Sequence, residues 1–249
     1  MVSHFGDEVV DLAAVIAKGE RPPEHGPYGI LIGNEHFQFT PVVIADPVVT
    51  GAQILSAAGV RQPVEHLLFQ VLADGRLEEI NPEETTDLRS SGAERFLVFR
   101  SDKTYRINLD DRALNWGARF ISGAALKTLA GVDLSDFDVW EIVVGGKDEL
   151  IGNKEFSDLE KPGVERFLTK RFSATIIVNA RPKEVHRRRL SYWDVVELAF
   201  PGAQPTPGTV YTIDYDRGPH ANPEGSLVEG QHVKVKEGMT FYVAVSDKS

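Results

Sequence analysis

The side chains that could do chemistry in this sequence are carboxylates and arginines, because its 249 residues include no cysteine. Without a thiol there are no disulfides, no zinc–thiolate sites and no thioester chemistry on this chain. The seven histidines lack the spacing of a metal-binding pair, and no serine lies in a Gly-x-Ser-x-Gly turn. No glycine-rich phosphate loop follows a strand-like segment. The sequence therefore predicts a protein that is not an enzyme and binds no organic cofactor.

Two groups of carboxylates are candidate calcium sites, since hard cations such as Ca²⁺ prefer oxygen ligands. In the first group, Asp214 and Asp216 alternate along the end of a predicted strand and share one face, and Glu224 follows in the next loop. The second group, just after a predicted helix, consists of Asp133, Asp136 and Asp138. Neither group has the spacing of an EF-hand loop. Solvated loop carboxylates are the alternative for each group, and ions shared between two copies of the chain would suit incomplete sites.

The charge is divided unevenly along the chain. The formal net charge is −10, and residues 174–249 carry nine Lys+Arg and nine Asp+Glu, so the whole excess lies in residues 1–173. An acidic chain lacks the basic face that displaces counterions, which argues against general nucleic-acid binding. The basic run Arg187, Arg188 and Arg189 is a candidate contact patch for the acidic part of another copy. A solvated hairpin strand is the alternative for this run.

No membrane-spanning or secretory segment is expected from the sequence. No stretch reaches the roughly 18 uninterrupted apolar residues that a membrane span needs. Residues 1–8 show no basic region followed by an apolar core, the pattern of a secretory signal. We therefore expect a cytoplasmic protein that contacts neither membrane nor nucleic acid.

The sequence repeats itself at a spacing of 71 or 72 residues. Val49-Thr50-Gly51-Ala52 recurs as Ile121-Ser122-Gly123-Ala124, and Asp87-Leu88 recurs as Asp158-Leu159. A third pair of matching segments consists of Glu94-Arg95-Phe96-Leu97 and Glu165-Arg166-Phe167-Leu168. A fainter third copy begins at Leu190-Ser191-Tyr192, before another helical run. Three units of about 72 residues therefore account for most of the chain.

Each unit has the same predicted order of elements. In the first unit, strands at 28–32 and 36–40 form a hairpin, Thr50 caps a short helix that ends at Gly59, and strands follow at 67–72, 76–80 and 95–99. The matching features of the later units are the helix caps Ser122 and Ser191 and the hairpin turns Asp110-Asp111 and Gly145-Gly146. Two strands, a helix and two or three more strands are the ββαββ order of a β-grasp, in which one helix covers one face of a sheet.

The predicted fold is therefore α+β, with three tandem β-grasp domains at residues 28–101, 102–172 and 173–249. Residues 1–27 precede them as a short helix over Asp7–Lys18 and a flexible linker. The helix is too apolar to stay exposed, so we expect it to dock on this or a neighbouring copy. The short connections between the domains favour a semi-rigid arrangement.

The three units resemble the bacterial multiubiquitin family. The resemblance is carried by the repeated Gly-Val, Asp-Leu and Gly-x-Glu-Arg-Phe motifs and, in the third unit, by the stretches 177–185, 190–192, 222–228 and 233–239. It covers about residues 28–249. It implies a ubiquitin-like protein whose partners are the activating, conjugating and deubiquitinase-like enzymes of a bacterial operon. It also implies self-assembly into a homo-oligomer, as a dimer or a filament, with calcium at subunit contacts.

The C-terminal segment differs from the tail of a ubiquitin-type modifier. Such a tail is thin and flexible and ends in Gly-Gly, so that its carboxylate can thread a narrow channel to be adenylated. Here no glycine follows Gly238, although the ending Asp247, Lys248 and Ser249 resembles that of the family. We therefore expect a non-enzymatic protein that acts by self-assembly and protein contact. The alternative is a covalent modifier joined through Ser249 or a trimmed end near Ser246.

Overall fold

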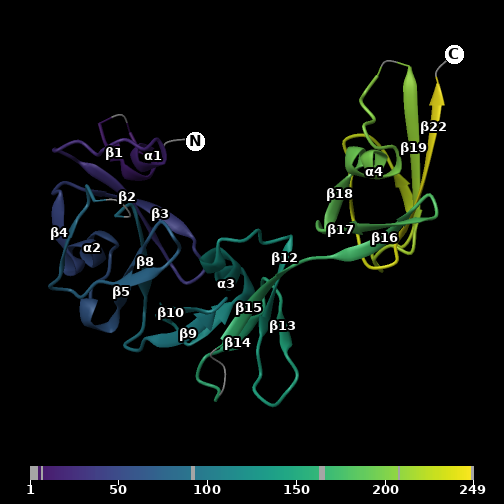
Figure 1. Cartoon of the computed structure of the whole chain (residues 1–249). Coiled ribbons are helices and arrows are strands. Elements are labelled where there is room, and N and C mark those ends of the chain that lie inside the picture. Colours follow the sequence, from purple (N-terminus) through teal and green to yellow (C-terminus); the bar gives the residue numbers. More distant parts are fainter. Residues whose placement is uncertain (1–4, 7, 91–92, 163–165, 207, 248–249) are drawn as a thin grey trace. The chain divides into compact units, whose positions relative to one another are not determined.

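The computed structural model describes residues 5–6, 8–90, 93–162, 166–206 and 208–247. By its internal contacts the chain divides into two compact bodies. The first body contains residues 1–134 and 138–170, which include the first two repeats. The second contains residues 135–137 and 171–249, which include the third repeat. Figure 1 labels many of the helices and strands of both bodies and colours the chain along its sequence.

The helices and strands recur in the same order in each repeat. The first repeat, with the segment before it, contains β1 (Val10–Asp11), α1 (Leu12–Ala17), β2 (Tyr28–Gly33), β3 (Phe39–Ile44), β4 (Val48–Thr50), α2 (Gly51–Ala57), the 3-10 helix η1 (Pro63–Glu65), β5 (Leu67–Val71), β6 (Leu77–Glu79), β7 (Thr85–Asp87) and β8 (Arg95–Phe99). The second contains β9 (Tyr105–Leu109), β10 (Arg112–Trp116), β11 (Phe120–Ser122), α3 (Gly123–Ala130), β12 (Phe137–Glu141), β13 (Glu149–Ile151), β14 (Phe156–Asp158) and β15 (Arg166–Arg171). The third contains β16 (Ala174–Val178), β17 (Arg181–Val185), β18 (Arg189–Ser191), α4 (Tyr192–Ala199), β19 (Thr209–Asp216), β20 (Gly225–Leu227), β21 (His232–Lys234) and β22 (Thr240–Asp247).

The three main sheets have one topology. Their strand orders are β3-β2-β8-β5-β6, β10-β9-β15-β12-β13 and β17-β16-β22-β19-β20. In each sheet the last long strand of the repeat lies in the middle and pairs in parallel with the first. This arrangement confirms the predicted α+β fold of three tandem β-grasp repeats. The prediction omitted the three short pairs β4–β7, β11–β14 and β18–β21 that flank the helices.

Each repeat's helix begins at the predicted cap. The hydroxyls of Thr50, Ser122 and Ser191 accept a hydrogen bond from the backbone N–H three residues later. Such a bond satisfies one of the N–H groups that the first helical turn leaves without a partner. Gly59 and Gly131 follow α2 and α3 with φ of 81° and 70°, the left-handed conformation that commonly ends a helix.

Two hairpin turns were predicted correctly, and one hairpin was placed wrongly. Asp110 and Asp111 have φ of 49° and 62°, the left-handed pair of a two-residue hairpin loop. Gly145 has φ of 75° in the connection between β12 and β13, as its predicted turn requires. In the first repeat the second strand was predicted at 36–40 but begins at Phe39. The side-chain oxygen of Asn34 accepts N–H bonds within the loop, which makes the turn longer than a two-residue hairpin.

The N-terminal helix is shorter than predicted and belongs to the first repeat. The prediction was Asp7–Lys18, whereas α1 covers Leu12–Ala17 because Val10 and Asp11 extend the first sheet as β1. Leu12 is fully buried in the core of the first repeat, so the helix docks on its own chain. The following segment is anchored as well, since Glu24 pairs with Arg89 at 2.8 Å.

The first two repeats share one hydrophobic core. The first repeat has its own core under α2, but the opposite face of its sheet packs against the second repeat. The Phe99 ring lies edge-on to Phe69 at 5.5 Å and to Trp116 of the second repeat at 4.8 Å. A Cβ on Gly117 would lie 2.6 Å from the Phe99 ring, so glycine permits this close approach. The third repeat has a separate core.

The glycine in the repeated Val-Thr-Gly-Ala and Ile-Ser-Gly-Ala motifs is a packing position. A Cβ on Gly123 would lie 2.6 Å from the carbonyl oxygen of Ile151, and a Cβ on Gly51 would overlap the carbonyl oxygen of Asn81. The first turn of each helix therefore lies directly against the loop that precedes the short strand β7 or β14. Among the described residues, no helix has the length and apolar character that crossing a membrane requires.

Candidate interaction surfaces of the third repeat

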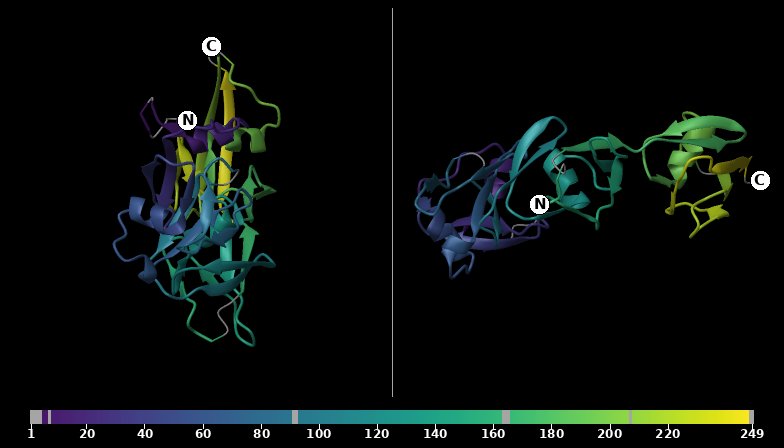
Figure 2. Two further views of the ribbon diagram at one scale, coloured as in Figure 1. Left: turned by 90° about the vertical axis from the view of Figure 1, so that its left-hand side faces the viewer. Right: turned by 90° about the horizontal axis from the view of Figure 1, so that it is seen from below.

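The C-terminal strand β22 is an integral part of the third sheet. It pairs with β19 over its whole length, from Thr240 opposite Asp216 to Asp247 opposite Thr209. Figures 1 and 2 show β19 and β22 side by side. Of the three predicted tail residues, Asp247 is thus the last residue of a strand, and Lys248 and Ser249 lie outside the described residues. The segment before them is an ordered strand rather than a flexible tail.

A single side chain fastens β22 where it leaves the parallel strand β16. The Asn179 amide donates to the carbonyl oxygen of Val243 at 2.9 Å, and its side-chain oxygen accepts from the Val243 N–H at 2.8 Å. The Asn179 N–H also donates to the Phe241 carbonyl. The parallel pairing with β16 involves Thr240 and Phe241, and Asn179 extends the contact by two residues.

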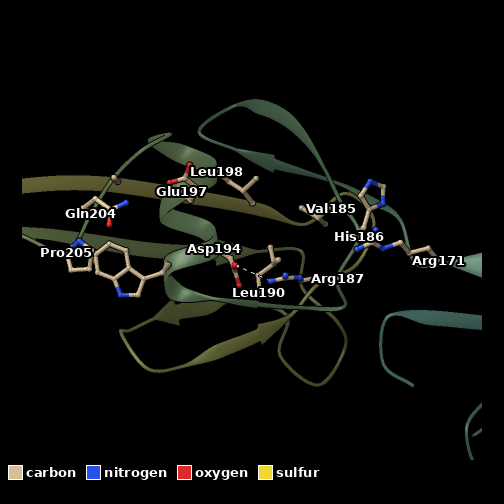
Figure 3. Close-up of a pocket in the computed structure, with 12 residues that line it drawn as sticks. Arg171, Val185, His186, Arg187, Leu190, Asp194, Glu197, Leu198, Gln204 and Pro205 are labelled. Carbon is tan, nitrogen blue, oxygen red and sulfur yellow. Dashed lines mark ion pairs between the residues drawn. The ribbon is translucent and has the colours of Figure 1, made fainter. Parts of the chain in front are cut away.

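A surface groove of about 610 Å³ runs along α4 in the third repeat. Its residues come from the end of β15, β17, the turn before β18, β18 itself, α4 and the segment after the helix (Figure 3). They include Arg171, Val185, His186, Arg187, Leu190, Trp193, Asp194, Glu197, Leu198 and Ala203. Both charges and apolar carbon line the groove, a combination that suits a protein surface better than a small metabolite.

The three predicted contact arginines lie in different surroundings. Arg187 lines the groove and pairs with Asp194 at 3.6 Å, the ion pair drawn as a dashed line in Figure 3. The Arg188 guanidinium lies 4.3 Å from the centroid of the Phe172 ring, a cation–π contact. Arg189 is exposed and begins β18. Only Arg187 therefore belongs to the groove.

The first carboxylate group lies on the outer face of the third sheet. Asp214 and Asp216 share one face of β19, as the strand period predicts, and the opposite face carries the buried Ile213. The Ser226 hydroxyl donates to Asp214 at 2.6 Å, and the Tyr242 hydroxyl donates to Asp216 at 3.0 Å. The second bond raises the pKa of Tyr242, because the hydroxyl proton is held by a carboxylate. Glu224 is exposed in the loop before β20.

The second carboxylate group is partly used within the fold. The Asp136 carboxylate accepts the Arg188 N–H at 3.0 Å, and its carbonyl accepts the Phe172 N–H at 2.7 Å. Asp133 precedes β12 and Asp138 lies within it. Across the residues that the structure describes, no three His, Asp or Glu side chains lie together in a way that could hold a metal ion. Neither group therefore forms a three-carboxylate site within one chain.

Sequence reasoning missed two surfaces. Trp193 and Leu198 of the groove were taken as part of an ordinary helical run, since nothing in their spacing separates a covered face from an open one. The packed outer face of the first sheet left a clearer signal. Leu67–Val71 and Arg95–Phe99 are nearly continuous apolar runs, typical of strands buried on both faces. By contrast, Thr209–Asp216 alternates between apolar and polar residues near its end, typical of a face open to water.

The comparison with known proteins agrees with the repeated fold. A family model described as Multiubiquitin matches residues 38–101, 105–171 and 174–247. The second and third stretches contain the second and third sheets, and the first stretch contains the first sheet except β1 and β2; together they cover most of the chain. Among curated proteins, none matches this chain.

Proposed function

The chain belongs to the multiubiquitin family, and from that premise we propose that it is a non-enzymatic ubiquitin-like protein acting by contact with other proteins, itself included. In this proposal it works in a bacterial ubiquitination-like pathway, where activating, conjugating and deubiquitinase-like enzymes are its partners. The observation that carries the proposal is the ordered strand β22, whose pairing with β19 extends to Asp247. Because this strand is part of the folded sheet, we infer that other proteins recognise the surfaces of the folded repeats.

The chemistry of activation supports contact rather than conjugation. Adenylation of a ubiquitin-type carboxylate needs several residues of narrow, extended chain beyond the fold. In β22 every residue after Gly238 carries a side chain, and Val243 is both buried and fastened by Asn179. Withdrawing this strand into a channel would break its bonds to β19, each of which contributes about 0.5–1.5 kcal/mol. The repeats also lack Gly-Gly at their connections.

We propose further that calcium assists self-association at contacts between copies. Asp214 and Asp216 present oxygen atoms on one face, and Ca²⁺ needs about six to eight such ligands. A second copy would supply the ligands that one chain does not bring together. Light scattering with calcium and then with a chelator tests this part. We expect larger particles with calcium, and an unchanged particle size would remove the metal from the proposal.

Sedimentation velocity over a range of protein concentrations tests self-association itself. The expected result is a rise in sedimentation coefficient with concentration, as mass action requires for an associating protein. A constant coefficient matching one chain at every concentration would refute self-association.

Intact mass spectrometry after co-expression with the activating and conjugating enzymes of such an operon separates contact from conjugation. We expect the unmodified mass. A covalent adduct at Ser249, or at a trimmed end near Ser246, would overturn the non-covalent proposal and favour the covalent modifier. A matched chain shortened by residues 248–249 identifies which end carries the adduct.

A further inference from the structure

The first body shows how one repeat docks on another. The outer sheet face of the first repeat, with Phe69, Leu97 and Phe99, packs against the second repeat beside its helix. Phe99 contacts Trp116 and Gly117 of the second repeat. All three outer-face side chains are at most 1% exposed, so the contact excludes water completely. The docking surface on the second repeat consists of the end of β10, the turn after it and the side of α3.

The groove on the third repeat occupies the same place in the β-grasp. Strand pairing establishes which residues correspond. Leu114 pairs with Ile107 in the second repeat, and Lys183 pairs with Ile176 in the third, so corresponding residues are 69 positions apart. At this offset Trp116 and Gly117 correspond to Val185 and His186, and the further pairs are Ala118 with Arg187, Ala125 with Asp194 and Leu129 with Leu198. All of the third-repeat residues in these pairs line the groove shown in Figure 3. The groove is therefore the counterpart of a surface that already accepts a β-grasp sheet.

The chemistry of the groove selects among the outer sheet faces that could enter it. The face of the first repeat is already buried against the second. In the second repeat, Lys170 takes the place of Phe99, and its ammonium lies 5.7 Å from the Trp140 ring centroid. Docked in the same way, Lys170 would lie beside Arg187, and contact between like charges weakens binding.

The outer face of the third repeat fits the groove in both size and charge. Pairing of Asp214 with Tyr242 matches the pairing of Phe69 with Leu97, so Ala244 takes the place of Phe99. Alanine leaves room for the imidazole of His186, where a phenyl ring requires glycine at that position. Asp214 is exposed on this face, and Tyr242 is 53% exposed beside it. The Ser226 hydroxyl holds the Asp214 carboxylate by a hydrogen bond of 2.6 Å.

We propose that the groove on the third repeat binds the outer sheet face of the third repeat of a second copy. In the manner of Phe99 on Gly117, Ala244 of one chain lies against His186 of the next, and the neighbouring Asp214 and Tyr242 meet Arg187. This inference rests on the proposed self-association and specifies which two surfaces make the contact. Because the groove and the sheet face are different surfaces, the contact is heterologous and builds a ring or an open chain of copies.

Charge reversal on each surface tests this contact. Arg187→Glu and Asp214→Arg should each weaken self-association at least about tenfold in sedimentation velocity, since each places like charges together. The double variant Arg187→Glu with Asp214→Arg restores an opposite pair and should recover much of the association. Arg189→Glu is the matched control, because Arg189 is exposed outside the groove and its reversal should leave association unchanged.

Mixing the two single variants gives the sharpest readout. The intact groove of Asp214→Arg accepts the intact sheet face of Arg187→Glu, and the reversed face of the first variant fits the reversed groove of the second. An equimolar mixture should therefore associate with the two variants in alternating order, although each variant alone associates weakly. Tyr242→Ala is a second variant on the same exposed face and should weaken association as Asp214→Arg does. Circular dichroism verifies that each variant is folded.

The outcomes separate this inference from the proposed function. If the unmodified protein associates but the charge variants associate equally well, or their mixture stays monomeric, the contact is wrong and self-association stands. If the unmodified protein remains a single chain at all concentrations, both are wrong. Loss in each single variant with recovery in the double variant and in the mixture supports the contact.

Discussion

Phe99→Ala should destabilise the first two repeats together and leave the stability of the third repeat unchanged. The ring is 1% exposed and makes edge-on contacts with Phe69 at 5.5 Å and Trp116 at 4.8 Å. Truncating a buried phenylalanine costs about 3–5 kcal/mol. The two ring contacts, each worth about 0.5–1.5 kcal/mol, favour the upper end of that range. With a urea slope of about 2–3 kcal/mol per M, the unfolding midpoint of this body falls by about 1–2.5 M.

Hydrogen exchange measured by mass spectrometry assigns the loss to segments. Peptides from β2 and β8 of the first repeat and from β9 and β15 of the second should lose protection to the same extent, because the ring lies in the hydrophobic core that the two repeats share. Peptides from β16 and β22 should keep theirs. Tryptophan fluorescence gives a second signal, since Trp116 and Trp140 report on the second repeat and Trp193 on the third.

Phe241→Ala is the matched control. Phe241 is fully buried in the core of the third repeat, so its truncation carries a similar cost but should lower protection only there. The reasoning is refuted if Phe99→Ala exposes the first repeat while the second keeps its protection, or if the urea midpoint does not move. Either result would mean that the two repeats touch without sharing their stability.

Three further predictions concern single positions. Alanine normally favours a helix, but Gly123→Ala should destabilise the protein by about 1–3 kcal/mol, because the added Cβ would lie 2.6 Å from a carbonyl oxygen. The control Thr128→Ala, on the exposed side of α3, should change the stability by no more than about 0.5 kcal/mol. Equal urea midpoints for the two variants would contradict this prediction. Hydrogen bonds from Arg119 lower the pKa of Asp158 to about 2. The stability that this carboxylate contributes is therefore complete above its unfolded pKa of about 3.8 and is lost as the pH falls through about 2. An NMR titration midpoint near 3.8 for Asp158 in the folded protein would be inconsistent with these bonds. Asn179→Gly keeps the positive φ of 48° but removes two side-chain hydrogen bonds to Val243. Hydrogen exchange at the Val243 amide should therefore accelerate about 5- to 30-fold or more. An unchanged exchange rate would show that Asn179 does not fasten β22.

The repeats and their local geometry could be predicted because their causes lie within a few residues. A hydroxyl at Thr50, Ser122 or Ser191 caps the helix that starts at the next residue, whatever packs against that helix later. The left-handed pair Asp110-Asp111 sets its hairpin in the same local way. The first hairpin was misplaced because the Asn34 side chain stabilises a longer loop, which a strand-length pattern does not reveal.

The candidate surfaces were predicted only in part, because they depend on which faces remain uncovered. The alternation in β19 correctly placed Asp214 and Asp216 on one face. The run Arg187–Arg189 was treated as one patch, but Arg188 turns to the Phe172 ring while Arg187 lines the groove. Adjacent residues on an irregular segment share no fixed direction, so sequence spacing could not separate them.

The sequence by itself determined that this protein consists of three β-grasp repeats with no thiol chemistry, since repeat spacing, helix caps and residue types are properties of the chain alone. Only the tertiary structure decided that the first two repeats form one body while the third keeps an open groove. The docking surface of the second repeat and the groove of the third are built on equivalent strands and an equivalent helix. They differ in whether another sheet covers them. That outcome follows from the fit of Phe99 against Gly117 and from the side chains of His186 and Arg187 at the matching positions of the third repeat, where such a ring would not fit.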